Sequence, residues 1–306
     1  MPPVKYVSMD GKIVPYDQGT VHVMSPAFRY GAVVFEGIRF YWSDSRKDLL
    51  LFRLREHLVR MLFSMKIMRF DHDLTVARME AGILEVIRRN ELRETGHIRL
   101  FAYVDGEGEQ SSQSPIRWAI TAIPMPRRAR VDSGVRCGIS SWQRINDNAM
   151  PPRAKVAANY NNGRMAMVQG KLDGFDNVIL LTQHGHISES PGSCFFMIRN
   201  GIPVTPAVTD SILESITRET LIQLFAEGLG MKVVERSIDR TEVYCAEEAF
   251  FCGSGQEVVP ILSVDHHAVG TGAIGETTRK LQKLYFDVVT GASSPHPEWI
   301  TPVYAK

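Results

Sequence analysis

The segment FRLREHLVRMLFSMKIM (52–68) decides the architecture of the first part of the chain. Its apolar residues recur at steps of three and four, which predicts an amphipathic helix over 53–68. These residues are Leu54, Leu58, Met61, Leu62, Met65 and Met68. A short apolar strand at 49–52 precedes this helix, and a second helix is expected from a cap region at 71–73 to about residue 89.

Strand patterns surround these two helices. Residues 4–16 have the pattern of a hairpin that turns at Asp10-Gly11, and residues 97–104 and 117–124 have the pattern of two further strands. Together with the helices they predict a small α+β domain over residues 1–126.

A polar stretch with prolines follows, and we expect an interdomain linker at 127–137. The remaining residues, 138–306, alternate between strand and helix patterns and predict a larger α/β domain. Within it, Asn200-Gly201 is a strong hairpin signal. The other expected elements are a strand near 135–142, helices at 161–172, 216–228 and 276–289, and a strand at 231–238.

Composition restricts the class of protein. The 306 residues carry 35 basic and 34 acidic side chains, so we expect neither a nucleic-acid nor an anionic-membrane partner. No apolar run approaches the roughly 20 residues that a membrane span needs, and the first twelve residues lack the apolar core of a secretion signal. We therefore expect a cytoplasmic protein.

The cysteines and histidines do not predict a metal site. The four cysteines are scattered without a CxxC pair, and the close histidine pairs, His184/His186 and His266/His267, have no carboxylate at ligand spacing. No GxGxxG follows a strand, and no GxSxG is present.

Four short segments combine side chains that catalysis can use. They are RAKVAANY (153–160) with Lys155 and Tyr160, HISE (186–189) with Glu189, SITRET (215–220) at a helix start, and the glycine turn CGSGQE (252–257). Alone, each has an ordinary explanation: a surface lysine, an exposed glutamate, an N-cap and a strand-connecting turn. A helix start and a glycine turn can also bind phosphate through their backbone amides.

The order of these segments resembles that of fold-type IV pyridoxal-phosphate enzymes, and the chain is similar to branched-chain amino acid aminotransferases over nearly its whole length. The matching blocks are VHVMSPAFRYGAVVFEGIR (21–39), FRLREHLVRM (52–61), AKVAANY (154–160), ISE (187–189), ITRET (216–220) and CGSGQEVVPI (252–261). The resemblance implies a D-amino acid aminotransferase-like fold, in which a small α+β domain and a larger, barrel-like α/β domain hold pyridoxal 5'-phosphate (PLP) in the cleft between them.

The resemblance assigns cofactor roles to residues of these blocks. It makes Lys155 the catalytic Schiff-base lysine, which also moves the substrate's proton, and places Glu189 against the pyridine nitrogen. The remaining cofactor residues are Tyr160 at the ring hydroxyl and, at the phosphate, Arg60, Ile216, Thr217 and Ser254.

The resemblance also implies a substrate site. Arg39 and Tyr30 would lie near the substrate carboxylate together with the turn at Ser254 and Gly255, and Arg99 would receive the distal carboxylate of glutamate. Phe35, Gly37, His97 and Met125 complete the expected pocket. Family members form homodimers or trimers of dimers, and Tyr30 would reach the partner's site.

Some positions depart from the family pattern. His97 stands where a tyrosine is expected, Met125 where an aromatic residue is common, Glu214-Ser215 where Pro-Gly is usual, and Cys194 lies in a changed run after Glu189. An acid beside a phosphate site is unfavourable unless it points away. The changes at His97 and Met125 predict an altered pocket whose substrates extend beyond leucine, isoleucine and valine to primary amines or aromatic amino acids.

The predicted reaction is a PLP-dependent ping-pong transamination from branched-chain L-amino acids to 2-oxoglutarate. Three alternatives stay open on the sequence alone. They are an (R)-amine or D-amino acid transaminase of the same fold, an aminodeoxychorismate-type lyase using the same cofactor, and a small-molecule binding protein on an inactive scaffold.

Overall fold

The computed structural model describes residues 4–293 and 295–305. The chain divides into two compact units, which are treated separately. Unit one comprises residues 1–126, 154–158 and 287–306, and unit two comprises residues 127–153 and 159–286. Among the described residues, no helix is long and apolar enough to cross a membrane.

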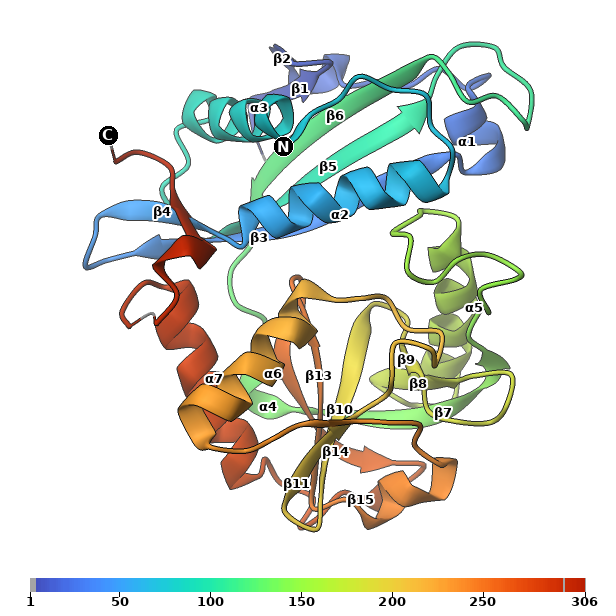
Figure 1. Ribbon diagram of the computed structural model, residues 1–306, viewed down its shortest axis with the longest axis vertical. Helices are drawn as coiled ribbons and strands as arrows, with labels where there is room; N and C mark the ends of the chain where they lie inside the picture. Colours follow the sequence, from blue (N-terminus) through green and yellow to red (C-terminus); the bar gives the residue numbers. More distant parts are fainter. Residues whose placement is uncertain (1–3, 294, 306) are drawn as a thin grey trace. The chain divides into compact units, whose positions relative to one another are not determined.

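Unit one contains an antiparallel sheet of seven strands in the order β16-β4-β3-β5-β6-β1-β2 (Figure 1). The strands are β1 (Tyr6–Met9), β2 (Lys12–Pro15), β3 (Val33–Ser43), β4 (Asp48–Phe52), β5 (Gly96–Val104), β6 (Ile116–Pro124) and β16 (Ile300–Pro302). The helices are α1 (Pro26–Tyr30), α2 (Leu54–Ile67) and α3 (Val76–Arg89), with short 3-10 turns η1 (Tyr16–Gln18) and η3 (Pro297–Trp299).

The two longer helices of unit one cover one face of this sheet. α2 contacts β3 and α3 contacts β6, and the side chains between them, such as Leu58, Met61 and Ile83, are fully buried. The apolar periodicity of 53–68 is thereby confirmed as the buried side of α2. The second helix begins later than expected, because Thr75 and not a residue of 71–73 caps it, accepting a hydrogen bond from the backbone of Arg78.

The expected hairpin at 4–16 is confirmed as β1 and β2, with Asp10 and Gly11 both at positive φ in the turn. The C-terminal segment was expected in the large domain. It belongs with unit one because β16 pairs with β4, and residues 154–158 join the same unit through backbone hydrogen bonds to β3.

Unit two contains a mixed sheet of nine strands in which β12-β11-β10-β13-β14-β7-β8 are neighbours, β15 pairs with β14 and β9 with β10 (Figure 1). The strands are β7 (Val135–Gln143), β8 (Asn177–Leu181), β9 (Glu189–Ser190), β10 (Ser193–Arg199), β11 (Ile202–Thr205), β12 (Val234–Glu235), β13 (Glu248–Gly253), β14 (Glu257–Val264) and β15 (His267–Ala268). The helices are α4 (Arg130–Ser133), α5 (Asn159–Leu172), α6 (Ile216–Leu229) and α7 (Glu276–Val289), with a 3-10 turn η2 (Arg240–Cys245).

The core of unit two is built from apolar side chains of these strands, among them Ile179, Phe195 and Phe251. The hairpin at Asn200-Gly201 joins β10 and β11, as expected. The strand expected at 231–238 is shorter: only Val234 and Glu235 pair, with β11. The fold class expected from the sequence, a mixed α/β protein, is confirmed.

Candidate active site

Lys155 lies at the edge of the unit-one sheet, in a segment that runs antiparallel to β3. Its backbone N–H donates to Ser64 Oγ at 3.0 Å, and its carbonyl accepts from the N–H of Phe35 at 3.0 Å. These bonds fix the main chain on both sides of the lysine. The side-chain amine lies over the ring of Phe35, with Nζ 4.8 Å from the ring centroid.

A row of cationic and aromatic side chains shares that face of the sheet. The register pairs Arg39 with His97 and Gly37 with Arg99, so all four residues lie on the face that carries Phe35. The guanidinium carbon of Arg99 is 6.0 Å from the centroid of the Phe35 ring. The ring of Phe35 therefore contacts the Lys155 amine and the Arg99 guanidinium.

His97 is held as a neutral imidazole within this row. Burial lowers its pKa to about 3, and the charges of Arg99, Arg39 and Lys155 act in the same direction. Gly37 leaves room for the ring, because a Cβ at that position would lie only 2.9 Å from His97 Nε2. The histidine that replaces the expected tyrosine thus adds no positive charge between the two arginines.

Two further residues of the expected substrate site, Met125 and Tyr30, also belong to unit one. Arg39 is buried and donates from Nη1 to the backbone carbonyl of Met125 at 2.8 Å, so Met125 acts here through its main chain. Tyr30, in α1, is 41% exposed, and its hydroxyl accepts a hydrogen bond from Arg29.

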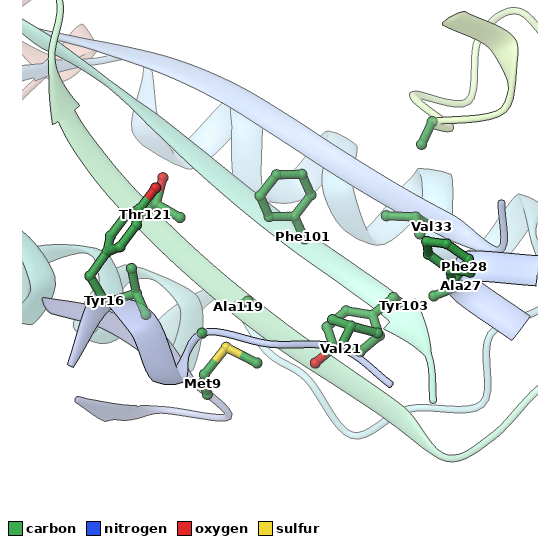
Figure 2. Close-up of a pocket in the computed structure, with 13 residues that line it drawn as sticks. Met9, Tyr16, Val21, Ala27, Phe28, Val33, Phe101, Tyr103, Ala119 and Thr121 are labelled. Atoms are coloured by element: carbon green, nitrogen blue, oxygen red, sulfur yellow. The ribbon is translucent and has the colours of Figure 1, made fainter. Parts of the chain in front are cut away.

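An apolar cavity of about 510 Å³ opens on the same face of unit one. Figure 2 shows Phe101 and Thr121 reaching into it from β5 and β6, with Val33 and Phe28 at another side. Phe101 packs on Phe35 with ring centroids 6.2 Å apart, so the cavity adjoins the cationic row. Its lining has the character of a site for an aliphatic or aromatic side chain.

Arg60, expected at a phosphate, projects from α2 and binds a carboxylate. Its Nε and Nη2 donate to Glu36 Oε1 and Oε2, each at 2.7 Å, and His57 Nδ1 lies 2.7 Å from the same carboxylate. Glu36 and His57 were not singled out from the sequence. The signal was present, since a glutamate inside the apolar run AVVFEGIRF must find a buried partner.

In unit two, Glu189 is the centre of a buried polar group. Arg144 Nη2 lies 2.8 Å from Glu189 Oε1, and both side chains are less than a tenth exposed. The backbone N–H of Leu213 donates to the same oxygen at 3.3 Å, and the Cys194 thiol lies 3.7 Å from Oε2. The Nε of Arg144 is buried without a hydrogen-bond partner in the part of the chain that the structure describes.

Sequence reasoning missed Arg144. It stands directly after β7 in a loop, and an isolated arginine there forms no pattern. Its role appears only when the fold brings it to a carboxylate 45 positions later in the chain. The Cys194 departure has a physical account as well: the thiol occupies the other side of the Glu189 carboxylate.

The expected phosphate-binding turns lie beside Glu189. Cys194 pairs with both Glu189 and Cys252, and the turn at Ser254 and Gly255 begins two residues after Cys252, directly past the end of β13. Leu213 connects Glu189 to the start of α6, where Ser215 is the N-cap and Ile216 and Thr217 form the buried first turn. Tyr160 stands half-buried in the first turn of α5.

The charge of Glu214, next to this helix start, is compensated. Arg153 Nη1 lies 3.0 Å from Glu214 Oε1. The acid therefore has a cationic partner, and because the pair is about half exposed, salt screens it.

The donor set of unit two fits PLP. A buried carboxylate fixed by an arginine suits a protonated ring nitrogen, a phenol suits the ring hydroxyl, and the start of a 14-residue helix with buried hydroxyls suits a phosphate. No group of three or more metal-ligating side chains occurs within residues 4–293 and 295–305.

Comparisons with known proteins agree with this geometry. The family model "Amino-transferase class IV" matches residues 33–264. The chain is 34% identical over 304 residues to a probable branched-chain-amino-acid aminotransferase of Aquifex aeolicus, covering 98% of this chain and 97% of the relative.

Solved structures are similar over the same length. A branched-chain aminotransferase of Thermoproteus uzoniensis with norvaline has a TM-score of 0.93 at 37% identity, covering 98% of this chain and 100% of that one. The enzyme of Thermobaculum terrenum in its PLP-form has a TM-score of 0.93 at 36% identity and covers all of both chains.

Proposed function

Since the chain belongs to the class IV aminotransferase family, we propose that it transfers the amino group of leucine, isoleucine and valine to 2-oxoglutarate, with PLP as its cofactor. The transfer is a ping-pong reaction in two halves. The expected site residues, the cytoplasmic location and the assembly as a homo-oligomer, dimer or trimer of dimers, are parts of this proposal.

The observation that carries the proposal is the set of groups that lie around the ring of Phe35. An amine, a guanidinium and an apolar cavity adjoin this one ring or its neighbour Phe101. A branched aliphatic side chain is compatible with the apolar lining, and the distal carboxylate of glutamate is compatible with Arg99. Both substrates of the two half-reactions thus find a matching group on one face of the sheet.

When bound, PLP would supply an electron sink for the negative charge that develops at the substrate's Cα. The protein's own groups do the rest. Lys155 would remove and return the proton at the substrate's Cα, and Glu189 would keep the cofactor's ring nitrogen protonated. Arg144 keeps the Glu189 carboxylate in place, while His97, being neutral, leaves the recognition of carboxylates to Arg39 and Arg99.

The function is tested by adding L-leucine to the purified protein loaded with PLP while its absorbance spectrum is recorded. We expect the band of lysine-bound PLP to disappear and the band of the pyridoxamine form to grow. Addition of 2-oxoglutarate should reverse the change. A panel of aromatic amino acids and primary amines in the same assay tests the wider range of donors predicted from His97 and Met125.

We expect Arg99→Met to raise the KM for 2-oxoglutarate by about tenfold or more, because the distal carboxylate loses a charged hydrogen-bond donor. The KM for 4-methyl-2-oxopentanoate should stay within about twofold, since that oxo acid has no distal carboxylate. Steady-state kinetics with both oxo acids measure the difference. Arg117→Met, which removes an arginine of β6 that pairs with Asp10, is the matched control and should change neither KM. Equal effects on both oxo acids would contradict a role of Arg99 in selecting the dicarboxylate.

A further inference from the structure

Glu36 is a fully buried acid in the middle of β3. Its side chain faces α2, and each carboxylate oxygen receives one N–H of the same guanidinium, that of Arg60, at 2.7 Å. Burial by itself raises the pKa of Glu36, but the charge of Arg60 and the hydrogen bonds of Arg60 and His57 hold it well below its ordinary value. The carboxylate is therefore ionised, and its bond to Arg60 is a charged, two-point contact.

His57 adds a third fixed contact to this carboxylate. It stands one turn before Arg60 on α2, is buried, and approaches Glu36 Oε2 through Nδ1. Burial lowers the pKa of His57 and outweighs the opposing effect of the Glu36 carboxylate. The imidazole is thus neutral and donates from Nδ1, which holds the carboxylate in place without adding a second charge.

This arrangement is more than is needed to attach α2 to β3. A buried ion pair gives little net stability compared with well-packed apolar side chains, so its presence calls for another reason. The start of the same helix shows a simpler alternative: Arg53, its N-cap, binds Glu56 three residues later and packs on Trp299. In Arg60, by contrast, two bonds to one carboxylate of the sheet set the plane of the guanidinium.

We propose that Glu36 and His57 are positioning residues that orient the Arg60 guanidinium to receive the phosphate of PLP. The proposal rests on the proposed function, because it takes Arg60 as a phosphate-binding residue. Glu36 binds the edge of the guanidinium that carries Nε and Nη2, so the phosphate is met from another direction. Glu36 also balances the charge of Arg60, so the net electrostatic attraction for the phosphate is small. The main contribution of Arg60 is then a set of directed hydrogen bonds from an ordered guanidinium.

The test compares a ligand that has the phosphate with one that lacks it. The full-length chain, freed of cofactor, is titrated with PLP and with pyridoxal for the unchanged protein and for Glu36→Gln and His57→Phe. We expect both variants to weaken PLP binding by about tenfold, because Arg60 loses its fixed orientation. Pyridoxal binding should change by less than about twofold, since no phosphate is present. Glu56→Gln, which breaks the Arg53 pair on the same helix, is the control and should alter neither affinity.

Thermal unfolding separates positioning from a structural role. If the variants lose stability while the ratio of PLP to pyridoxal affinity is unchanged, the pair is a structural clamp and the inference is overturned. If Glu36→Gln does not fold, His57→Phe carries the same comparison. Arg60→Gln tests the proposed phosphate site separately from the positioning role. If this variant binds PLP as tightly as the unchanged protein, Arg60 is not part of the phosphate site. A loss with Arg60→Gln but not with the Glu36 and His57 variants would overturn the positioning role alone.

Discussion

Lys155→Ala is expected to lower kcat for transamination from leucine by at least about 10⁴-fold, because it removes the side chain proposed both to anchor the cofactor covalently and to move the Cα proton. The backbone around the lysine is held by Ser64 and Phe35, and neither contact uses the side chain. The variant should therefore fold like the unchanged protein. Stopped-flow absorbance of the leucine half-reaction, measured on protein loaded with PLP, gives the rate.

Two further measurements make this prediction specific. Lys171→Ala removes an exposed lysine near the end of α5 and should leave kcat unchanged. Methylamine added to Lys155→Ala should restore part of the rate, because a small amine can replace the missing base. A Lys155→Ala variant that keeps more than about a tenth of the activity would show that another group moves the proton.

Most helices and turns of the fold were predictable from local sequence patterns. The helix over 53–68, the turn at Asp10-Gly11 and the hairpin at Asn200-Gly201 were predictable because their signals lie within a few residues of each other. The strand expected at 231–238 failed for a tertiary reason. Its residues have a strand-like composition, yet in the described structure the register with β11 covers Val234 and Glu235 alone.

Long-range pairings could not be predicted in the same way. The attachment of residues 154–158 and 287–306 to unit one depends on hydrogen bonds to β3 and β4, far away in the sequence. No local sequence pattern predicts such contacts. In addition, β16 is only three residues long, which is too short to give a strand pattern. A boundary drawn from composition therefore divides the chain once, whereas the structure returns to unit one twice.

The candidate site shows the same division. The side chains proposed to touch cofactor or substrate were assigned through the resemblance of sequence blocks to a known family. The groups that hold those side chains, Arg144 at Glu189 and the pair Glu36 and His57 at Arg60, were not. Their residue types are ordinary and their spacing carries no signal. They became recognisable through burial, which makes an unpartnered charge costly and so identifies each partner.

Glu189 is the position where the remaining large effect is expected. Glu189→Gln should lower kcat on the order of 10²-fold, because a neutral amide cannot hold a proton on the ring nitrogen and the carbanion loses its electron sink. The buried Arg144 adds to the expected loss of activity. Once the carboxylate is replaced by an amide, its guanidinium faces an uncharged group. The half-reaction with leucine and the spectrum of the bound cofactor report the two effects separately.

Cys194→Ser is the matched control for Glu189→Gln. It alters the other neighbour of the same carboxylate, at a similar depth, but leaves the charge in place. We expect its kcat to remain within about threefold of the unchanged protein, since a hydroxyl can also donate to the carboxylate. Equal losses in the two variants would mean that packing around the carboxylate, and not its charge, sets the rate. A large loss in Glu189→Gln alone would assign the effect to the negative charge that Arg144, Leu213 and Cys194 jointly hold at this point of the sheet.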